Sequence, residues 1–94
     1  MIRIEQQDDA KKGRFIIYED DQKAGEITYT WARDTKFIID HTEVNKAFSG
    51  KGLAKKLVLS AADFARKNEI KIVPLCPYAK HVFEKEKELQ DLVV

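Results

Sequence analysis

The first half of the chain alternates apolar and polar residues with the period of a β-strand. Residues 2–4, 15–18, 27–31 and 37–44 each place aliphatic or aromatic side chains on one or both faces of an extended segment. This period of two, in residues that favour sheets, is typical of half-buried strands. Between the first two runs lies a polar gap, residues 6–13. The other links are short, which predicts an antiparallel meander.

The second half changes to a helical period. Leu53, Leu57, Ala61 and Phe64 fall on one face, while most lysines and arginines fall elsewhere. This spacing predicts an amphipathic helix over residues 52–68.

A short strand and a second helix follow. Residues 71–73 form an apolar run that Pro74 ends. Pro77 suits the first position of a helix, which we expect over residues 77–87. The apolar residues of the tail, 89–94, are expected to pack on the core.

The order of elements predicts an α+β fold: an antiparallel meander followed by a β-α-β unit. A right-handed crossover makes the last strand parallel to the fourth, so the sheet is mixed and two main helices pack against it. In such sheets ligands bind at the carboxyl ends of strands, where neighbouring strands part. With 94 residues, the chain is expected to form a single domain, residues 1–94, with one modest core.

Charge and cysteine content narrow the classes of partner. The chain carries 17 basic and 16 acidic residues, a net charge of +1, which gives no general attraction to nucleic acid or membrane. No apolar run has the length of a membrane span, and the first residues do not resemble a signal peptide. One cysteine forms no internal disulfide. We therefore expect a cytoplasmic monomer whose Cys76 stays a free thiol.

A glycine pair carries the clearest functional signal. Gly50 and Gly52 stand one residue apart, after a strand and directly before a helix. The first N–H groups of a helix have no partner within it, and the helix dipole adds positive character there. The segment 49–54 therefore predicts an anion site, and phosphate is the anion that such loops commonly hold.

Two familiar phosphate motifs do not match this loop. The P-loop needs Gly, four residues, and then Gly-Lys-Ser/Thr, whereas Gly52 follows Lys51 and no glycine stands at the upstream position. The dinucleotide fingerprint needs a third glycine three residues after the second, where this chain has Lys55.

The segment Ser49-Gly50-Lys51-Gly52-Leu53-Ala54 resembles the acyl-CoA loop of the GNAT superfamily of N-acetyltransferases, whose pattern is Arg/Gln-x-x-Gly-x-Gly/Ala. Residues 40–44 and the Pro74-Leu75-Cys76-Pro77 segment strengthen the resemblance to a compact, single-domain subgroup. Together these features cover residues 39–93. The chain departs from the pattern at Ser49, which puts a side-chain contact in question but leaves the backbone loop intact.

The resemblance implies a GNAT-like fold and acetyl-CoA as cosubstrate. The pyrophosphate would accept hydrogen bonds from N–H groups of residues 51–55, and the pantetheine arm would run beside residues 42–44. Lys51, Lys55 and Lys56 would be the cationic side chains nearest the phosphates. The cofactor-binding residues expected in this way are Thr42, Val44, Ser49, Gly50, Lys51, Gly52, Leu53, Ala54 and Lys55.

Cys76 is the second focus of chemistry. Because Pro77 begins a helix, Cys76 lies at or next to its N-cap, where unpaired N–H groups lower a thiol pKa. A thiolate beside an acetyl thioester would accept the acyl group and pass it on, or act as a base. The alternative is a buried structural cysteine, which is the common role of a lone cysteine.

Three further residues are candidates for proton transfer. His41 and Glu43 lie two apart on a strand and share one face, so either is a candidate base for an incoming amine. Tyr78 is a candidate acid for the departing CoA thiolate, as tyrosines at this place are in GNAT enzymes; packing is the alternative. Cys76, His41 and His81 have no close ligand spacing, so no metal is expected.

Two functions of different kind follow. The first is an acetyl-CoA-dependent N-acetyltransferase that acts on a small amine or a protein or peptide lysine, by direct attack or through Cys76. The second is a non-catalytic module that binds CoA and senses acyl groups, favoured by the departure at Ser49. Nucleic-acid binding is disfavoured by the near-neutral charge.

Overall fold

The computed structural model describes residues 1–94, which fold into five strands, two α-helices and two 3₁₀ turns. The elements, in chain order, are β1 (Ile2–Asp8), β2 (Lys12–Glu19), β3 (Gln22–Arg33), β4 (Lys36–Val44), η1 (Lys46–Phe48), α1 (Leu53–Lys67), β5 (Lys71–Pro74), α2 (Pro77–Lys85) and η2 (Lys87–Leu92).

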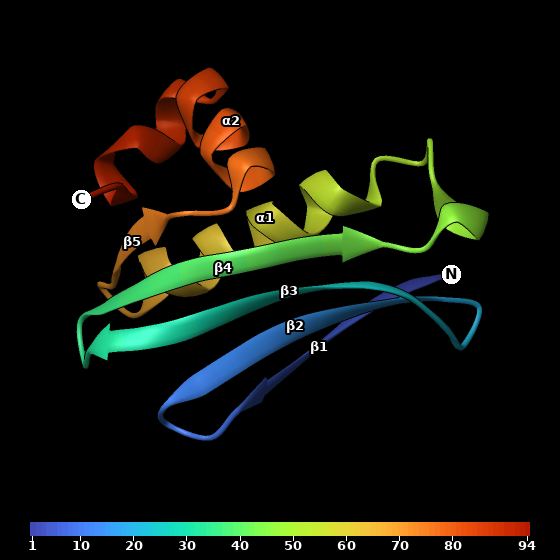
Figure 1. The fold of residues 1–94 in the computed structure, drawn as a ribbon, viewed down its shortest axis with the longest axis horizontal. Coiled ribbons are helices and arrows are strands. Elements are labelled where there is room, and N and C mark those ends of the chain that lie inside the picture. Colours follow the sequence, from blue (N-terminus) through green and yellow to red (C-terminus); the bar gives the residue numbers. More distant parts are fainter.

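The five strands form one mixed sheet in the order β1-β2-β3-β4-β5 (Figure 1). The first four strands pair antiparallel, and β5 pairs parallel to β4 after the crossover through α1. The predicted fold class, a meander followed by a β-α-β unit, is confirmed.

Residues 6–13 are polar and lie outside the strands predicted from the sequence, but most of them belong to β1 and β2, which pair as far as Asp8 and Gly13. The turn between them needs only three residues. An Asp8 carboxylate oxygen accepts from the Ala10 amide at 2.7 Å, and the Asp9 carboxylate accepts from the Lys12 amide at 2.7 Å. Side-chain hydrogen bonds of this kind close tight turns. Most of β1 is exposed, so its second half is polar and shows no hydrophobic alternation from which a strand could be predicted.

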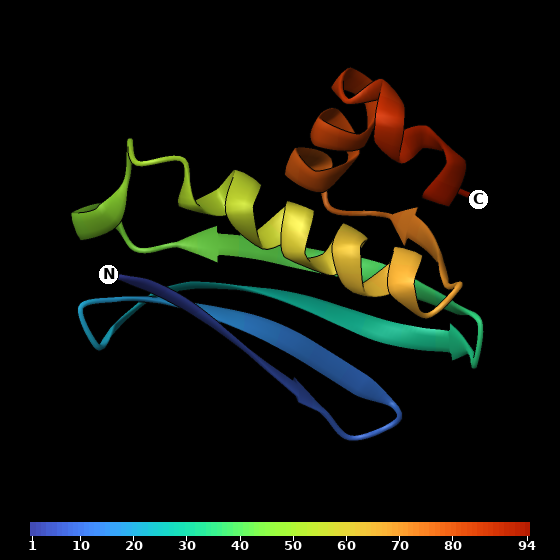
Figure 2. The same ribbon diagram turned by 180° about the vertical axis from the view of Figure 1, so that it is seen from behind.

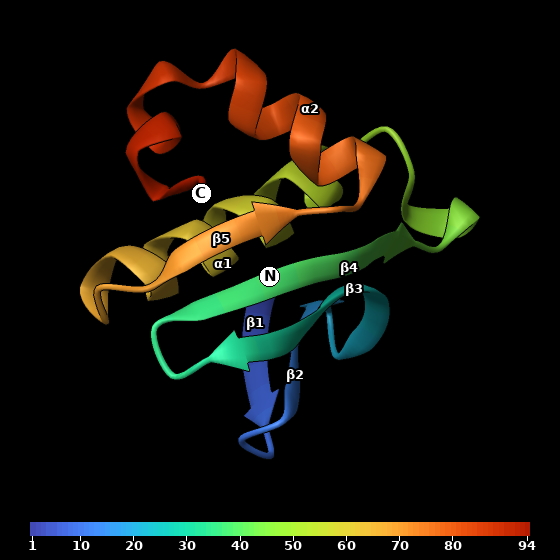
Figure 3. The same cartoon turned by 60° about the vertical axis from the view of Figure 1, so that its left-hand side comes forward.

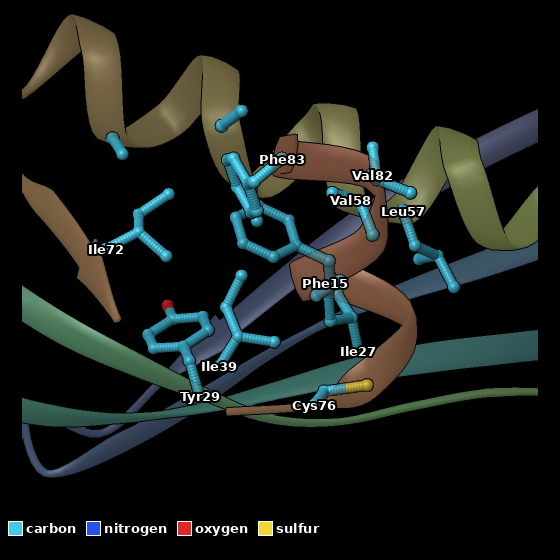
Figure 4. Close-up of a cluster of buried hydrophobic side chains, with 14 of the residues drawn as sticks. Phe15, Ile27, Tyr29, Ile39, Leu57, Val58, Ile72, Cys76, Val82 and Phe83 are labelled. Carbon is cyan, nitrogen blue, oxygen red and sulfur yellow. The ribbon is translucent and has the colours of Figure 1, made fainter. Parts of the chain in front are cut away.

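One face of the sheet carries the hydrophobic core. Figure 2 shows α1 in front of β4, and contacts of α1 extend from β2 to β5. Figure 4 shows aliphatic side chains of α1 directed toward the sheet, with Phe83 of α2 among them. Tyr29, Phe37 and Ile39 of the sheet and Leu57 and Val58 of α1 are almost completely buried in this cluster. Burial of apolar side chains is the main term that holds the helices on the sheet.

The other face of strands β1 to β4 carries no helix (Figure 1). Ile16 lies on this face and is still only 3% exposed, outside the main core cluster. Ion pairs lie on the same face: the Glu26 carboxylate is 3.1 Å from the Arg14 guanidinium and 2.8 Å from the Lys23 ammonium. We call this surface the uncovered face.

Both helices begin where the sequence predicts. Gly52 is the N-cap of α1 and Cys76 the N-cap of α2. α2 ends at Lys85, two residues earlier than expected, because Glu86 turns to an extended conformation. The tail packs on the core through Leu89 and Leu92, as predicted. No helix of the chain is both long enough and apolar enough to cross a membrane.

Candidate active site

The loop before α1 leaves a row of backbone N–H groups free. None of the six amides from Gly50 to Lys55 donates a hydrogen bond within the protein, and the first bond of the helix is from Lys56 to Gly52 at 3.2 Å. No side chain caps α1, and no acidic residue lies in its first turn. The helix dipole is therefore unopposed at this end, which favours a bound anion.

The two glycines give this loop its shape. Gly50 has a φ of 80° and Gly52 a φ of 74°, both in the left-handed region that glycine adopts without strain. A Cβ atom placed on either one would meet no atom within 4 Å. The space in front of the loop is therefore open to an approaching group.

The side chains around the loop are already engaged. The Lys51 ammonium donates to Glu19 at 2.8 Å and lies 5.7 Å from the centre of the Phe48 ring. The Lys55 ammonium lies 3.7 Å from the Glu86 carboxylate. The structure thus directs two of the three predicted phosphate-facing lysines toward carboxylates. Glu19 and Glu86 each lie more than thirty residues from their lysine along the chain, so no local pattern predicted these ion pairs.

The hydroxyl of Ser49 is engaged within the protein and is not free to contact a ligand. Its Oγ donates to the carbonyl of Lys46 at 2.9 Å and its amide donates to the same carbonyl at 3.1 Å. Both bonds close the η1 turn. What the loop offers to an anion is therefore its backbone.

A gap opens between β4 and β5 beyond their last paired residues. The parallel pairing ends at Ile39 and Pro74, and the amides of Leu75 and Cys76 both donate to the Ile39 carbonyl at 3.1 Å. The chain then turns into α2 while β4 continues (Figure 3). The next five residues of β4 have no strand partner on that side.

Alternation along β4 assigns which groups face this gap. The Asn45 amide donates to Ala24 of β3 at 2.8 Å, so the amides of Val44 and Thr42 point the opposite way. In agreement, the Thr42 amide is one of the groups that lower the pKa of the Cys76 thiol. Thr42 and Val44 therefore direct backbone amides between the parted strands, and their role in binding a cofactor stays a prediction.

Cys76 lies where β5 becomes α2, at the border of the core (Figure 4). It is 5% exposed, and its Sγ lies 3.5 Å from the Thr42 hydroxyl. Burial raises the pKa of the thiol, but the Thr42 hydroxyl and the amides of Ala79, Tyr78 and Thr42 outweigh burial, so the net pKa lies below its usual value. The Cys76 side chain makes no capping hydrogen bond to the first amides of α2. These amides therefore stabilise the thiolate mainly as oriented dipoles.

His41 and Glu43 lie on the uncovered face. Their side chains are exposed, and the imidazole Nε2 is 3.7 Å from the carboxylate. Thr42, between them, faces the opposite side, where it meets Cys76. The structure therefore brings His41 and Glu43 together as expected but separates both from the cysteine by the thickness of β4.

Asp40 is a residue of this region that the sequence did not single out. Thr28 pairs with His41 and Tyr29 with Ile39, so Asp40 is the extra residue of a β-bulge. The Thr30 hydroxyl donates to its carboxylate at 2.6 Å. A bulge bends and twists its strand locally, and here it coincides with the point where β4 leaves β5. Only the strand register reveals it.

Tyr78 occupies the first turn of α2, and its side chain is 38% exposed. Burial of part of the ring raises the pKa of its hydroxyl, so the group stays protonated at neutral pH and able to donate. Together with Lys55 and later residues of α2 it lines a groove between the two helices. No three His, Cys, Asp or Glu side chains come close enough together to hold a metal ion.

Comparison with known proteins identifies the fold and the family. A family model described as GCN5-related N-acetyl-transferase matches residues 14–92. The chain belongs to this family of acyltransferases. The resemblance noted in the acyl-CoA loop is thereby confirmed at the level of the family, and the expected enzyme class with it.

Solved structures agree with this assignment. A GCN5-like protein from Staphylococcus aureus is 35% identical, with a TM-score of 0.75, and the match covers 98% of this chain and 87% of that one. A ribosomal-protein-alanine N-acetyltransferase from Brucella melitensis biovar Abortus 2308 is 22% identical, with a TM-score of 0.70 over 82% of this chain and 62% of that one.

A GNAT family acetyltransferase from Elizabethkingia anophelis, with acetyl-CoA bound, is 11% identical. Its TM-score is 0.67 over 78% of this chain and 63% of that chain. The chain thus spans less than two thirds of these last two structures, which share its fold. No protein with a curated function matches the sequence.

Proposed function

We propose that this member of the GCN5-related family transfers an acetyl group from acetyl-CoA to a primary amine, either a small amine or a lysine of a peptide or protein. The observation that carries the proposal is the row of six unpartnered amides from Gly50 to Lys55 beside the gap between β4 and β5. An anion cradle next to a gap with free strand amides suits a ligand that is part diphosphate and part amide chain.

The residues present fit acetyl-CoA. The amides of the loop would hold the pyrophosphate, and a Cβ atom on Gly50 or Gly52 would meet no atom within 4 Å beyond the adjoining residues, so this side of the loop is open. The amides of Thr42 and Val44 would pair with the pantetheine arm where β5 has left β4. The acetyl-CoA seen in the Elizabethkingia structure supports the choice of cosubstrate.

In the direct route, the chain's residues act on an amine that arrives from the uncovered face. Glu43 or His41, both exposed on that face, takes a proton from the incoming ammonium group, and the neutral amine then attacks the thioester carbon while its bond to the CoA sulfur breaks. The Val44 amide donates to the carbonyl oxygen of the thioester and stabilises the charge that develops there. Tyr78, whose hydroxyl stays protonated, donates a proton to the departing thiolate.

In the covalent route, Cys76 acts from the other side of β4. Its thiolate forms a bond to the acetyl carbon while the carbon–sulfur bond to CoA breaks, and Tyr78 protonates the CoA thiolate. The amine then attacks the acetyl-cysteine, the carbon–sulfur bond to Cys76 breaks, and the released Cys76 thiolate takes the proton that the amine loses. The depressed pKa of the thiol supports this route.

A specific observation favours the second candidate, a non-catalytic acyl-sensing module. No carboxylate or imidazole contacts the Cys76 sulfur, whose one side-chain partner is the Thr42 hydroxyl. A module of this kind would bind acetyl-CoA through the loop without turning it over.

Release of CoA from acetyl-CoA, measured with and without a panel of small amines and lysine peptides, separates the two. Acceptor-dependent release with an acetylated product supports the transferase. Tight binding of acetyl-CoA with no release by any acceptor supports the sensor. The expected monomer and cytoplasmic location remain predictions, which sedimentation and cell fractionation test.

A further inference from the structure

A groove of about 230 Å³ separates the first turn of α1 from the length of α2. We call it the interhelix groove. Its residues on α2 recur at spacings of three and four, so they share one face of that helix. It is lined by Lys55, Tyr78, His81, Val82, Lys85 and Glu86.

The interhelix groove carries an excess of positive groups. Lys55 is matched by Glu86 at 3.7 Å, and this carboxylate is the one acidic group of the lining. Lys85 and His81 make no ion pair, and both side chains are exposed. Unmatched basic groups at the wall of a groove favour an anionic ligand.

The groove is continuous with the anion cradle through Lys55. The amide of this residue is the last of the six free amides, and its side chain lines the groove. A group that is covalently attached to a diphosphate on the cradle therefore lies next to the groove.

The polarity of the cofactor decides which group that is. Under the proposed function the acetyl end lies by Cys76, at the start of α2. Lys85 lies at the other end of this helix, seven residues from Tyr78, or about 10 Å at 1.5 Å per residue. The nucleotide end of CoA is the end remote from the acetyl group, and its ribose bears a 3′-phosphate.

We infer that Lys85 and His81 form a phosphomonoester site for the ribose 3′-phosphate of CoA, and that Lys55 exchanges Glu86 for the same phosphate. The inference rests on the proposed use of acetyl-CoA. It assigns to α2 a specificity role: the site distinguishes CoA from dephospho-CoA, which has the same pyrophosphate and the same pantetheine arm.

Calorimetric titration of the whole protein with CoA and with dephospho-CoA tests the inference without relying on turnover. The wild-type protein should bind CoA about tenfold more tightly, since one charge-assisted contact has about this value. Lys85→Ala should weaken CoA binding about tenfold and leave dephospho-CoA binding unchanged. Lys80→Ala removes the same charge from an exposed residue of α2 outside the groove, and should change neither.

Equal binding of the two ligands by the wild-type protein would overturn the site while leaving the proposed function intact. If Lys85→Ala weakened the binding of CoA and dephospho-CoA equally, or if Lys80→Ala lost the same CoA affinity as Lys85→Ala, the site would also be overturned. Failure of both ligands to bind would overturn the proposed use of CoA and this site with it. His81→Gln is a second variant in the groove, and it should likewise weaken binding of CoA but not of dephospho-CoA. Thermal unfolding of each variant tests whether the compared proteins are folded.

Discussion

The sulfur of Cys76 lies 3.5 Å from the hydroxyl oxygen of Thr42, and no imidazole or carboxylate makes a hydrogen bond or ion pair with it. The two candidate bases, His41 and Glu43, face the opposite side of β4. The reactivity of the thiol therefore depends on a neutral hydroxyl and on backbone dipoles. A thiolate held in this way needs no paired base, because the helix N-terminus supplies the stabilising charge.

Replacement of Thr42 by valine should raise the pKa of Cys76 and lower its reactivity at neutral pH several-fold. Valine has the shape of threonine but offers no hydroxyl to the thiolate, while the backbone amides and the burial of the sulfur are unchanged. Because the chain has one cysteine, the rate of its alkylation by iodoacetamide as a function of pH reports this group alone.

Thr42→Ser is the matched control, since it keeps the hydroxyl and removes only a methyl group. It should restore a thiol pKa below the ordinary value. A valine variant whose thiolate forms at the same pH as in the wild-type protein would contradict the role assigned to the hydroxyl.

The Cys76→Ser variant distinguishes the two chemical routes. Serine preserves the N-cap of α2, so the fold is expected to persist, but its hydroxyl is not ionised at neutral pH. If the acetyl group passes through Cys76, turnover should fall at least a hundredfold, and the acetylated wild-type protein seen by intact mass should vanish in the variant. Unchanged turnover together with an absent acetyl adduct would establish the direct route instead.

The sequence contained most of the fold and the start of the site. The helical spacing of Leu53 and Leu57 and the placement of Pro77 identified both helix starts, because a helix start is determined by residues close together in the chain. The glycine pair located the loop for the same reason. Each of these signals is local, and each agrees with the packing that the core imposes.

The rest depends on contacts between distant segments. Lys51 turns toward Glu19 and Lys55 toward Glu86. Such partners become neighbours only once the sheet and helices are assembled, so spacing along the chain could not reveal them. The bulge at Asp40 was equally hidden, because it is a property of the register between two strands rather than of either strand.

Gly52→Ala should weaken CoA binding and lower the free energy of unfolding by about 1 kcal/mol, the cost of a left-handed conformation in a residue with a Cβ. The methyl group itself meets no atom within 4 Å, so the cost is conformational and not steric. Relief of that strain would move the loop amides out of register with the pyrophosphate. Titration with CoA and chemical denaturation measure the two effects.

Gly13→Ala provides a contrast at the other end of the sheet. A Cβ atom there would lie 2.3 Å from the Tyr29 ring, so the substitution should destabilise the protein by about 1–3 kcal/mol through overpacking. The folded protein should still bind CoA with its original affinity. Full CoA affinity in Gly52→Ala, or a CoA-specific loss in Gly13→Ala, would contradict the assignment of the loop.

Stability in acid should depend on Asp8, which gathers the polar groups at the edge of the aromatic cluster. Its Oδ2 accepts from the Tyr29 hydroxyl at 2.6 Å and from the Trp31 indole N–H at 2.9 Å. Partial burial raises the pKa of Asp8, but these bonds and the Ala10 amide outweigh it, so the pKa in the folded protein lies below the ordinary value. The ionised carboxylate therefore stabilises the fold above the ordinary pKa of aspartate, and this contribution is lost as the pH falls through the lowered pKa.

Asp8→Asn removes that charge and should lower the free energy of unfolding at pH 7 by about 1 kcal/mol, the typical net value of such a hydrogen bond. For a domain of this size the melting temperature should fall by roughly 4–8 °C. The difference between wild type and variant should begin to shrink as the pH falls below about 4, the ordinary pKa of aspartate, and should vanish once the pH lies below the lowered pKa of the folded protein, where the wild-type carboxyl is protonated as well. Melting curves at a series of pH values measure this, and a difference that stays constant down to pH 2 would show that the charge of Asp8 does not stabilise the fold.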